Sequence, residues 1–422
     1  MTRRVPTPTP MLTPTTPTAP EAEAGRSSQE ASLRELARFF FGLSVVGFGG
    51  PAAHLSIMQR ELVERRGWLS QAEFLDLLGA TNLIPGPNST EMAIHIGHRR
   101  AGIRGSLVAG LCFICPAALI TLGLAWLYVR FGRLPRVQPM LQGIQASVVA
   151  VVGLASLTLS RTALSRPGLR GLAALAFAAA LAGLPELPLF FGGGLLYLLS
   201  VWLHQRSPSL RPPSGGTAAA GFLGVTAWLS STASASGLAV SSSATTAVSL
   251  PALGWFFAKV GSVIYGSGYV LVALLLHGVV EQQHWLSREA LLDAVAIGQI
   301  TPGPVFTTAT CIGYFVRGAA GAGVATLGIF APSFALVWLL AALLLRLRQS
   351  RSLRWFLDGV NACSLAVLAA TACLLLAQQR GSPGWLAFSL AALLLGHFLR
   401  LNPSWLILAG ALAGALAPLL FS

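Results

Sequence analysis

The chain has 422 residues, of which 54% are hydrophobic and only 10% are charged. A soluble protein of this length does not need so many uncharged runs, so the composition excludes an ordinary soluble domain and predicts a polytopic membrane protein. The net charge of +14, from 28 basic and 14 acidic residues, comes mainly from arginines between apolar runs. This distribution is typical of cytoplasmic loops under the positive-inside rule, and it argues against a nucleic-acid partner.

Composition divides the chain into four parts. Residues 1–30 are rich in Pro, Thr, Ser and Glu, and they predict a disordered tail rather than a signal peptide, because no apolar core follows the basic start. Residues 31–204 and 251–422 hold the apolar runs and form two expected membrane units. Residues 205–250, rich in Ser, Thr, Ala, Gly and Pro, predict a flexible linker between them.

In the first unit, a helical pattern over 33–46 stops at Phe48-Gly49-Gly50-Pro51. Glycine permits unusual backbone angles there, and proline removes a helical hydrogen bond. Ser70 with Glu73 predicts the capping box of a helix that ends at Pro85. Pro87 then favours the start of a new helix, since proline suits the first helical position. Further apolar spans are expected near 106–129, 137–160, 169–184 and 187–204.

The same pattern occurs a second time. Trp68-Leu69-Ser70 recurs as Trp285-Leu286-Ser287, and Pro85-Gly86-Pro87 recurs as Pro302-Gly303-Pro304, both at an offset of 217 residues. A match of this length indicates an internal duplication, so the sequence predicts an all-α polytopic membrane protein with two homologous repeats. The second repeat predicts helical segments near 252–276, 287–300, 305–317, 321–345, 353–377, 384–399 and 403–420.

Each Pro-Gly-Pro break is a candidate anion site. A helix that starts inside the membrane leaves main-chain amides unpaired in its first turn, and the positive end of the helix dipole also attracts anions. Two such starts could face each other around one binding site. The alternative is that each break is merely a loop between ordinary helices. The candidate substrate-binding residues are Gly49, Gly50, Pro85, Gly86, Pro87, Asn88, Ser89, Thr90, Lys259, Gly266, Ser267, Thr301, Pro302, Gly303, Pro304 and Thr307.

Ionisable residues in apolar runs are further candidates. Lys259 is the only lysine, and a cation inside the membrane costs at least about 2.5 kcal/mol and usually faces a cavity or a partner. Snorkelling at a helix end is the alternative. Asp76 and Asp293 are repeat-matched carboxylates that could carry a proton or form a salt bridge. Glu91 and His95 lie one helical turn apart and could move protons in the first repeat only.

The sequence lacks the signatures of an enzyme. It has no phosphate-binding Gly-Lys-Ser/Thr loop, no His-Glu-x-x-His and no Gly-x-Ser-x-Gly. The five cysteines lie in apolar runs, and Cys112 and Cys115 have no second pair or histidine nearby to complete a metal site. We therefore expect no enzymatic activity, no cofactor and no metal site.

Longer motifs surround the breaks in both repeats. They are Phe48-Gly49-Gly50-Pro51-Ala52-Ala53-His54, Arg66-x-Trp68-Leu69-Ser70, Pro85-Gly86-Pro87-Asn88-Ser89-Thr90, Arg100-Ala101-Gly102, Lys259-Val260-Gly261-Ser262, Tyr265-Gly266-Ser267-Gly268-Tyr269 and Thr301-Pro302-Gly303-Pro304. Together they resemble the chromate ion transporter family, over residues 35–200 and 252–420. The chain departs from the family at Gly42, where members often carry a basic residue.

The resemblance implies a two-repeat transporter that exports chromate from the cytoplasm, with halves of opposite membrane orientation. We therefore expect a secondary transporter of the cell (inner) membrane that works by alternating access around the two broken helices. The arginine-rich loops do not settle the orientation, because matched loops in both halves fit parallel repeats unless the broken segments change the number of membrane crossings.

The alternatives are a transporter of sulfate-like oxyanions, an anion channel and, more weakly, an intramembrane enzyme or scaffold. Chromate and sulfate are both tetrahedral dianions of similar size, which amide donors would not separate sharply. The expected partners are a chromate- or sulfate-like oxyanion, the lipid bilayer and, as one option, a second copy in a homodimer.

Overall fold

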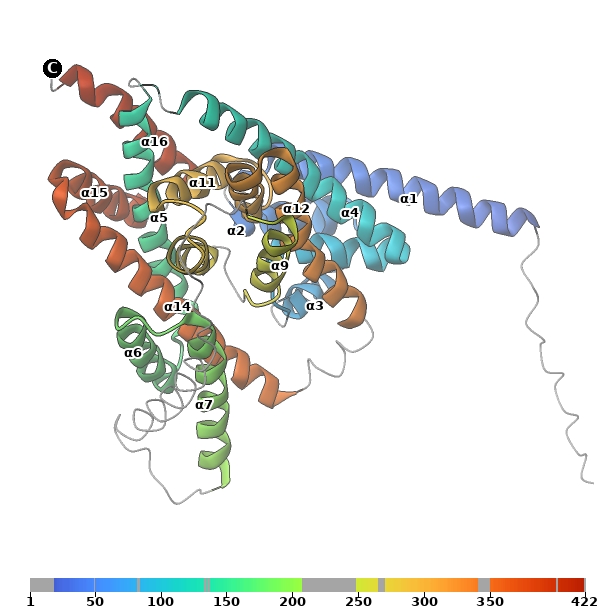
Figure 1. Cartoon of the computed structure of the whole chain (residues 1–422). Coiled ribbons are helices and arrows are strands. Elements are labelled where there is room, and N and C mark those ends of the chain that lie inside the picture. Colours follow the sequence, from blue (N-terminus) through green and yellow to red (C-terminus); the bar gives the residue numbers. More distant parts are fainter. Residues whose placement is uncertain are drawn as a thin grey trace, which may run out of the picture.

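The computed structural model describes residues 19–48, 50–81, 84–132, 134, 137–206, 248–264, 270–340, 350–399 and 401–420. Every regular element within these residues is helical (Figure 1), which confirms the all-α prediction. The first repeat contains α1 (Ala19–Val46), α2 (Gly50–Met58), the π-helical η1 (Gln59–Arg65), α3 (Gln71–Thr81), α4 (Asn88–Phe131), α5 (Gln138–Ala163), α6 (Pro167–Leu181) and α7 (Glu186–Arg206). The second contains α9 (Leu250–Gly261), α10 (Val270–Leu275), the π-helical η3 (Leu276–Gln282), α11 (Arg288–Ile300), η4 (Val305–Thr307), α12 (Thr308–Leu340), α14 (Arg351–Gln378), η5 (Gln379–Gly381), α15 (Pro383–Leu399) and α16 (Pro403–Leu420).

The helix starts follow the local sequence signals. The Ser70 amide donates to Glu73 Oε2 at 2.8 Å and the Glu73 amide donates to Ser70 Oγ at 3.2 Å, which confirms the predicted capping box at α3. Ser287 caps α11 by accepting from the Ala290 amide at 3.2 Å. The helix α1 begins at Ala19, inside the segment expected to be a tail, while the rest of that tail and most of the linker lie outside the described residues.

The helices α4 and α12 are each a hairpin of two arms. Backbone angles leave the helical range at Ala101 and Gly102 in α4, and at Arg317 and Gly318 in α12. The two glycines have φ values of +58° and +62°, a left-handed region that side chains other than glycine rarely adopt. The first arm of α4, residues 88–100, is about 20 Å long, which is too short to cross an apolar core of about 30 Å. The chain therefore turns back before it has crossed the membrane and continues as the second arm.

Equivalent helices of the two repeats run antiparallel. In the second arms of α4 and α12, Trp338 Nε1 donates to Ser106 Oγ at 2.8 Å, and Gly110 leaves room for the ring of Phe334. Along α4 from Ser106 to Gly110, the contacted residue on α12 changes from Trp338 back to Phe334. The two arms therefore run antiparallel. The repeats are inverted, as the resemblance implies. Parallel repeats, with which the arginine-rich loops would also have been compatible, do not agree with these antiparallel contacts.

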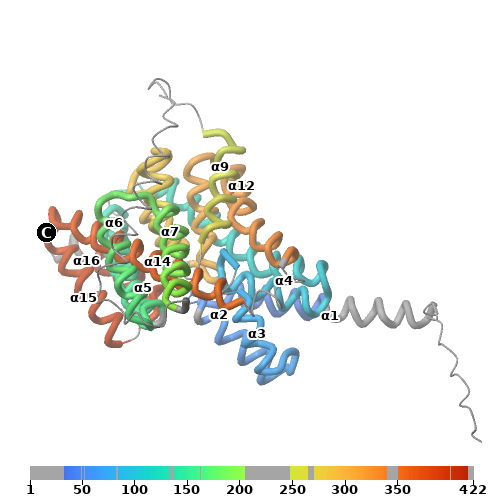
Figure 2. The backbone as a smooth tube through the Cα atoms, turned by 90° about the horizontal axis from the view of Figure 1, so that it is seen from below, coloured from blue at the N-terminus to red at the C-terminus, as the bar shows by residue number. Residues whose placement is uncertain are grey.

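The helices assemble into two groups, and each group has members from both repeats (Figure 2). The break-bearing group comprises α1–α4 and α9–α12 with their short π and 3₁₀ segments; in it α1 packs on α4, α9 on α12, and α4 on α12. The C-terminal helix group comprises α5–α7 and α14–α16; in it α5 packs on α15 and α16, and α14 packs on α6 and α7. In the C-terminal helix group, helices of one repeat thus pack on helices of the other repeat.

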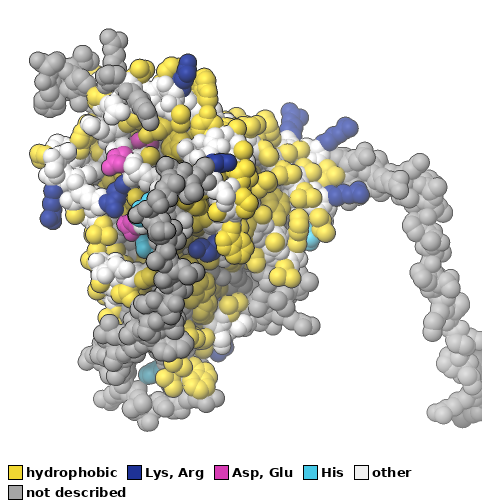
Figure 3. All heavy atoms as spheres, in the orientation of Figure 1, with side chains coloured by type: hydrophobic (Ala, Val, Ile, Leu, Met, Phe, Trp, Pro, Cys, Tyr) yellow, Lys and Arg dark blue, Asp and Glu magenta, His cyan; other side chains and the backbone are white. Residues whose placement is uncertain are grey.

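The surface is suited to a bilayer. Within the described residues, five helices are long and apolar enough to cross a membrane, namely Asn88–Phe131, Gln138–Arg161, Glu186–His204, Val305–Leu339 and Arg351–Gly381. Large apolar side chains such as Leu119 (67% exposed) and Trp255 (73% exposed) point outward. Figure 3 shows hydrophobic side chains over much of one face. Monomeric soluble proteins rarely expose such surfaces, so the chain is a multi-pass membrane protein.

Candidate functional site

Both Pro-Gly-Pro breaks are buried where the two repeats meet. The Gly86 amide of the first break donates to the Ile264 carbonyl, just beyond the end of α9, at 2.7 Å. The Gly303 amide of the second break donates to the Gly47 carbonyl, just beyond the end of α1, at 3.0 Å. Donors and acceptors are related by the same offset of 217 residues. Each break is therefore held by the other repeat.

These hydrogen bonds reduce the number of main-chain amides that remain free to bind an anion. The amides of the two central glycines already donate to protein carbonyls. In the turns that follow, the Thr90 amide donates to the Pro87 carbonyl at 2.8 Å, and the Thr307 amide donates to the Pro304 carbonyl at 3.1 Å. An anion at either break would meet the first-turn amides closest to the prolines and the hydroxyls beside them.

Most of the predicted site residues lie at the breaks. The buried ones are Pro85, Gly86, Pro87, Ser89, Thr90, Thr301, Pro302, Gly303, Pro304 and Thr307. Asn88 is half-buried in the first turn of α4, and Gly50 is half-buried at the start of α2. Gly49, Gly266 and Ser267 lie outside the described residues.

Lys259 does not join the buried residues of either break. Its side chain is exposed in the last turn of α9, whereas Phe257 and Val260 on the same helix face the core. A cation in the last turn is favoured by the negative end of the helix dipole. The position therefore suits stabilisation of α9, whose following segment supplies the carbonyl of Ile264 to the first break.

Two serines that the sequence did not single out face the breaks. A Cβ built on Gly86 would lie 2.6 Å from Ser333 Oγ, and a Cβ built on Gly303 would lie 3.1 Å from Ser44 Oγ. Both serines are fully buried, and neither hydroxyl has a hydrogen-bond partner within the described residues. Such hydroxyls are the groups that a ligand or an ordered water would satisfy. The sequence feature that could have identified Ser333 is its position directly after Pro332 in an apolar run.

The repeat-matched aspartates have different environments. Asp76 is exposed on α3. Asp293 on α11 is only 3% exposed, and it accepts hydrogen bonds from the Tyr128 hydroxyl at 2.6 Å and from Gln145 Nε2 at 3.0 Å. The donors belong to α4 and α5, so this carboxylate joins the two repeats and the two helix groups. Nothing in the local sequence marks either donor.

We predict that Tyr128→Phe lowers stability by about 1–3 kcal/mol, because the substitution removes one donor from a buried carboxylate and leaves the rest of the ring in place. Thermal unfolding of the purified protein in detergent measures this as a lower Tm. Tyr314→Phe is the matched control, since the Tyr314 hydroxyl makes no hydrogen bond recorded among the described residues. Equal Tm values for the two variants would contradict the role of the Tyr128 hydroxyl.

Arginines form two positively charged pockets away from the breaks. The first, of ≈ 210 Å³, is lined by Trp68, Leu69, Ile96, Arg99 and Arg100. The second, of ≈ 410 Å³, is lined by Arg166, Arg351, Arg354, Trp355 and Asp358. In the second pocket Arg166 pairs with Asp358 at 3.0 Å, which joins the start of α6 to the first turns of α14. The basic side chains thus gather at helix ends.

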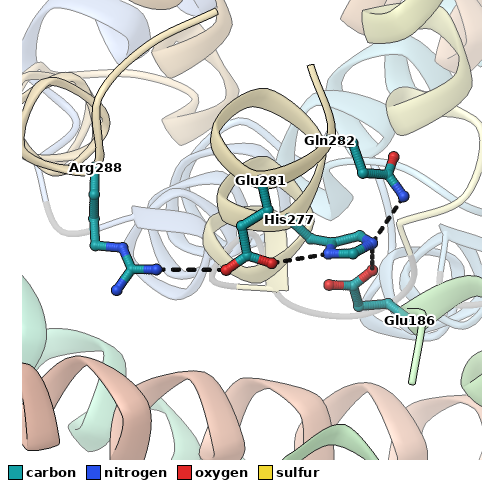
Figure 4. Close-up of polar contacts among 5 residues, drawn as sticks. All are labelled: Glu186, His277, Glu281, Gln282 and Arg288. Carbon is teal, nitrogen blue, oxygen red and sulfur yellow. Dashed lines mark hydrogen bonds and ion pairs between the residues drawn. The ribbon is translucent and has the colours of Figure 1, made fainter. Parts of the chain in front are cut away.

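A polar cluster around His277 joins α7 to η3 (Figure 4). His277 Nδ1 lies 3.0 Å from Glu281 Oε2, and Nε2 lies 2.8 Å from Gln282 Nε2 and 3.8 Å from Glu186 Oε2. Arg288 is 3.4 Å from the other oxygen of Glu281. Glu281 is 47% exposed, so solvent screens part of this network and its contribution to stability is modest.

A sequence model of the family described as Chromate transporter matches residues 34–198 and 251–415, one match in each repeat. The chain belongs to the chromate transporter family. It is 31% identical over 421 residues to the Chromate transport protein of Cupriavidus metallidurans. This match covers 97% of this chain and 100% of the relative.

Two further relatives have similar names. The chain is 31% identical to the Probable chromate transport protein of Synechococcus elongatus, over 80% of this chain and 83% of the relative. It is 30% identical to the Chromate transport protein of Pseudomonas aeruginosa, over 81% of this chain and 80% of the relative. No solved structure matches the chain. In this member of the chromate transporter family, the family model matches each repeat once and each match contains one break. The two breaks therefore occupy equivalent positions in the two repeats.

Proposed function

We propose that this protein exports chromate across the cytoplasmic membrane by alternating access around the two Pro-Gly-Pro breaks. The observation that carries the proposal is the pair of reciprocal hydrogen bonds, from Gly86 to Ile264 and from Gly303 to Gly47. Because each break is held by the other repeat, a rotation of one repeat against the other changes both breaks together. Membership of the family and the names of the relatives support chromate as the substrate.

The oxyanion is bound by first-turn amides and by hydroxyls near the breaks. Ser89 and Thr90 are buried at the start of α4, and the Thr90 hydroxyl has no hydrogen-bond partner among the described residues. The helix dipoles of α4 and α12 add positive potential without a charged side chain. Donors of this kind recognise charge and tetrahedral shape, so sulfate is the competitor expected to bind as well.

The distribution of the arginines supports one orientation of the protein in the membrane. Arg100, Arg166 and Arg354 lie at one end of the helices, because α5 and α14 run antiparallel and the α4 hairpin turns at that end. Fewer described arginines, such as Arg130 and Arg317, lie at the other end. The positive-inside rule places the richer end in the cytoplasm. Export of an anion is then favoured by about 2.3 kcal/mol per charge per 100 mV of inside-negative potential.

The test is flux in proteoliposomes that contain the purified full-length protein. Saturable chromate transport with a counterflow signal is the expected result, and sulfate should compete for it. Saturable sulfate transport that chromate does not affect would replace chromate as the substrate. Unitary conductance in a planar bilayer would identify a channel. Failure to move either oxyanion would refute transport and favour a scaffold or an intramembrane enzyme.

We predict that Lys259→Ala reduces chromate flux strongly, at least about tenfold, and that Lys259→Arg reduces it much less. Although Lys259 lies outside the breaks, no acidic partner of its side chain is recorded among the described residues, so its charge can attract an anion that approaches them. Initial rates in proteoliposomes at equal protein content measure the effect, and thermal unfolding of both variants provides the control. A lower Tm with normal flux would assign Lys259 to stabilisation of the end of α9 instead.

A further inference from the structure

Among the described residues, two carboxyl groups are buried, and their surroundings differ. Asp293 is held by donors from Tyr128 and Gln145, as an ionised carboxylate requires. Glu91 is 0% exposed, and neither of its carboxylate oxygens has a hydrogen-bond partner among the described residues. The surroundings of Glu91 therefore suit a carboxyl group that changes its protonation state, while those of Asp293 supply two hydrogen-bond donors to its carboxylate.

Glu91 lies directly at the first break. It stands in the first turn of α4, and a Cβ built on Gly86 would collide with Glu91 Oε1. The same Cβ would lie 2.6 Å from Ser333 Oγ of α12, so glutamate and serine face each other across the glycine. Ser333 Oγ, like both carboxylate oxygens, has no recorded hydrogen-bond partner among the described residues, so both groups are available to a ligand. A substrate at this break would share the space with the carboxyl group.

The groups that face Glu91 provide no compensating cation. On its own helix, the ionisable neighbour is His95 one turn further on, which is 4% exposed and whose Nε2 lacks a hydrogen-bond partner within the described residues. From α12 the facing group is Ser333. Ala80 of α3 and Ile84 just before the first break are apolar and pack with Ile94 and Val337. No arginine or lysine contact with Glu91 is recorded in the described part of the chain.

These surroundings link the charge of Glu91 to the charge of the substrate. An oxyanion beside an ionised carboxylate in a water-excluded site would meet strong repulsion. A protonated carboxyl group removes the repulsion and donates a hydrogen bond to the anion. Conversely, the bound dianion favours the protonated form of Glu91, since a like charge nearby disfavours ionisation. Proton and anion therefore bind cooperatively.

We propose that Glu91 binds one proton together with the oxyanion and releases it when the anion leaves, which makes the protein a proton-coupled anion symporter. The inference rests on the proposed function and specifies its coupling. The proton comes from water on the side to which the first break is open, and it returns to water on the opposite side. His95, buried one helical turn further along α4, is the candidate group for passing this proton on.

The experiment uses wild-type protein in proteoliposomes that contain a pH-sensitive dye, with a chromate gradient and the membrane potential clamped by potassium and valinomycin. The chromate gradient is expected to drive protons in the direction of chromate movement. In Glu91→Gln the proton signal per chromate moved should fall at least about tenfold, because glutamine keeps the shape and cannot titrate. In Asp293→Asn, a buried carboxyl group changed in the same way, the ratio of protons to chromate should be unchanged.

The outcomes separate this inference from the proposed function. Wild-type protein that moves chromate without protons would overturn proton coupling and leave chromate transport intact, whether or not the variants fold. Unchanged proton coupling in Glu91→Gln would also overturn the assignment to Glu91. Sulfate as a second probe covers the remaining case: proton-coupled sulfate movement without chromate movement would retain the coupling and refute the substrate.

Discussion

Replacing Gly303 with alanine should reduce oxyanion transport by at least about 30-fold while the protein still inserts in the membrane. Gly303 has a φ of +92°, which an L side chain rarely adopts, and its added Cβ would lie 2.6 Å from the Cβ of Ala117. Backbone strain of about 1–3 kcal/mol and overpacking of about 1–3 kcal/mol would fall on one peptide. The same peptide donates to Gly47, so the loss of this hydrogen bond releases the second break from the first repeat.

Gly86→Ala should have the same effect at the first break, where φ is +142° and the added Cβ would meet Glu91 and Ser333. The matched control is Gly323→Ala, since Gly323 lies in the second arm of α12 and its Cβ would meet nothing within 4 Å. Flux in proteoliposomes is the measurement, with size-exclusion profiles to verify folding. Wild-type flux in Gly303→Ala and Gly86→Ala would contradict the broken-helix site.

The features that local sequence determines were predictable. The duplication follows from matched motifs, and the helix at Ser70 follows from a capping box that only needs residues three positions apart. The breaks follow from proline and glycine, which act on their own backbone wherever they stand. The turn at Gly102 is also local, and it falls in the gap that was left before the predicted span 106–129; the turn at Gly318 likewise falls between the predicted segments 305–317 and 321–345.

The features that depend on distant residues were not predictable from one sequence. The acceptor of the Gly86 amide is the carbonyl of Ile264, and main-chain acceptors carry no signature in a sequence. Asp76 and Asp293 have matched positions, but only Asp293 is covered by side chains of the other repeat. Lys259 was predicted either to face a cavity or to snorkel at a helix end, and its side chain is exposed in the last turn of α9; periodicity does not tell which side of a short helix faces the protein.

The exchange of contacts between repeats links the break-bearing group to the C-terminal helix group. Reciprocal hydrogen bonds join the repeats at the breaks, and α5 and α14 pack on the last helices of the opposite repeat. A movement of either group is therefore shared by both repeats, which is the property that symmetrical alternating access requires. The close contacts of the C-terminal helix group should accordingly be among the least tolerant positions of the fold.

Gly410→Val should destabilise the protein by at least about 3 kcal/mol, because α5 and α16 touch through their main chains. Gly410 on α16 lies against Gly143 and Ser147 on α5, and Gly414 one turn further on lies against Pro139 and Met140. Small residues four apart on both helices allow this approach, and dispersion forces between the backbones hold it in lipid. A valine side chain would have to separate the helices and would disturb the hydrogen bond from Ser147 Oγ to the Leu406 carbonyl, now 2.8 Å.

Thermal unfolding in detergent measures the loss, and Gly384→Val is the control, because Gly384 at the start of α15 has nothing within 4 Å of its added Cβ. Gly359→Val tests the equivalent contact in the opposite repeat, where a Cβ built on Gly359 of α14 would lie 2.9 Å from the Gly194 Cα of α7. If the repeats exchange helices as described, both variants should lower Tm by similar amounts and Gly384→Val should not. A normal Tm for Gly410→Val would mean that α16 does not pack on α5, because a valine cannot be accommodated between two backbones in contact.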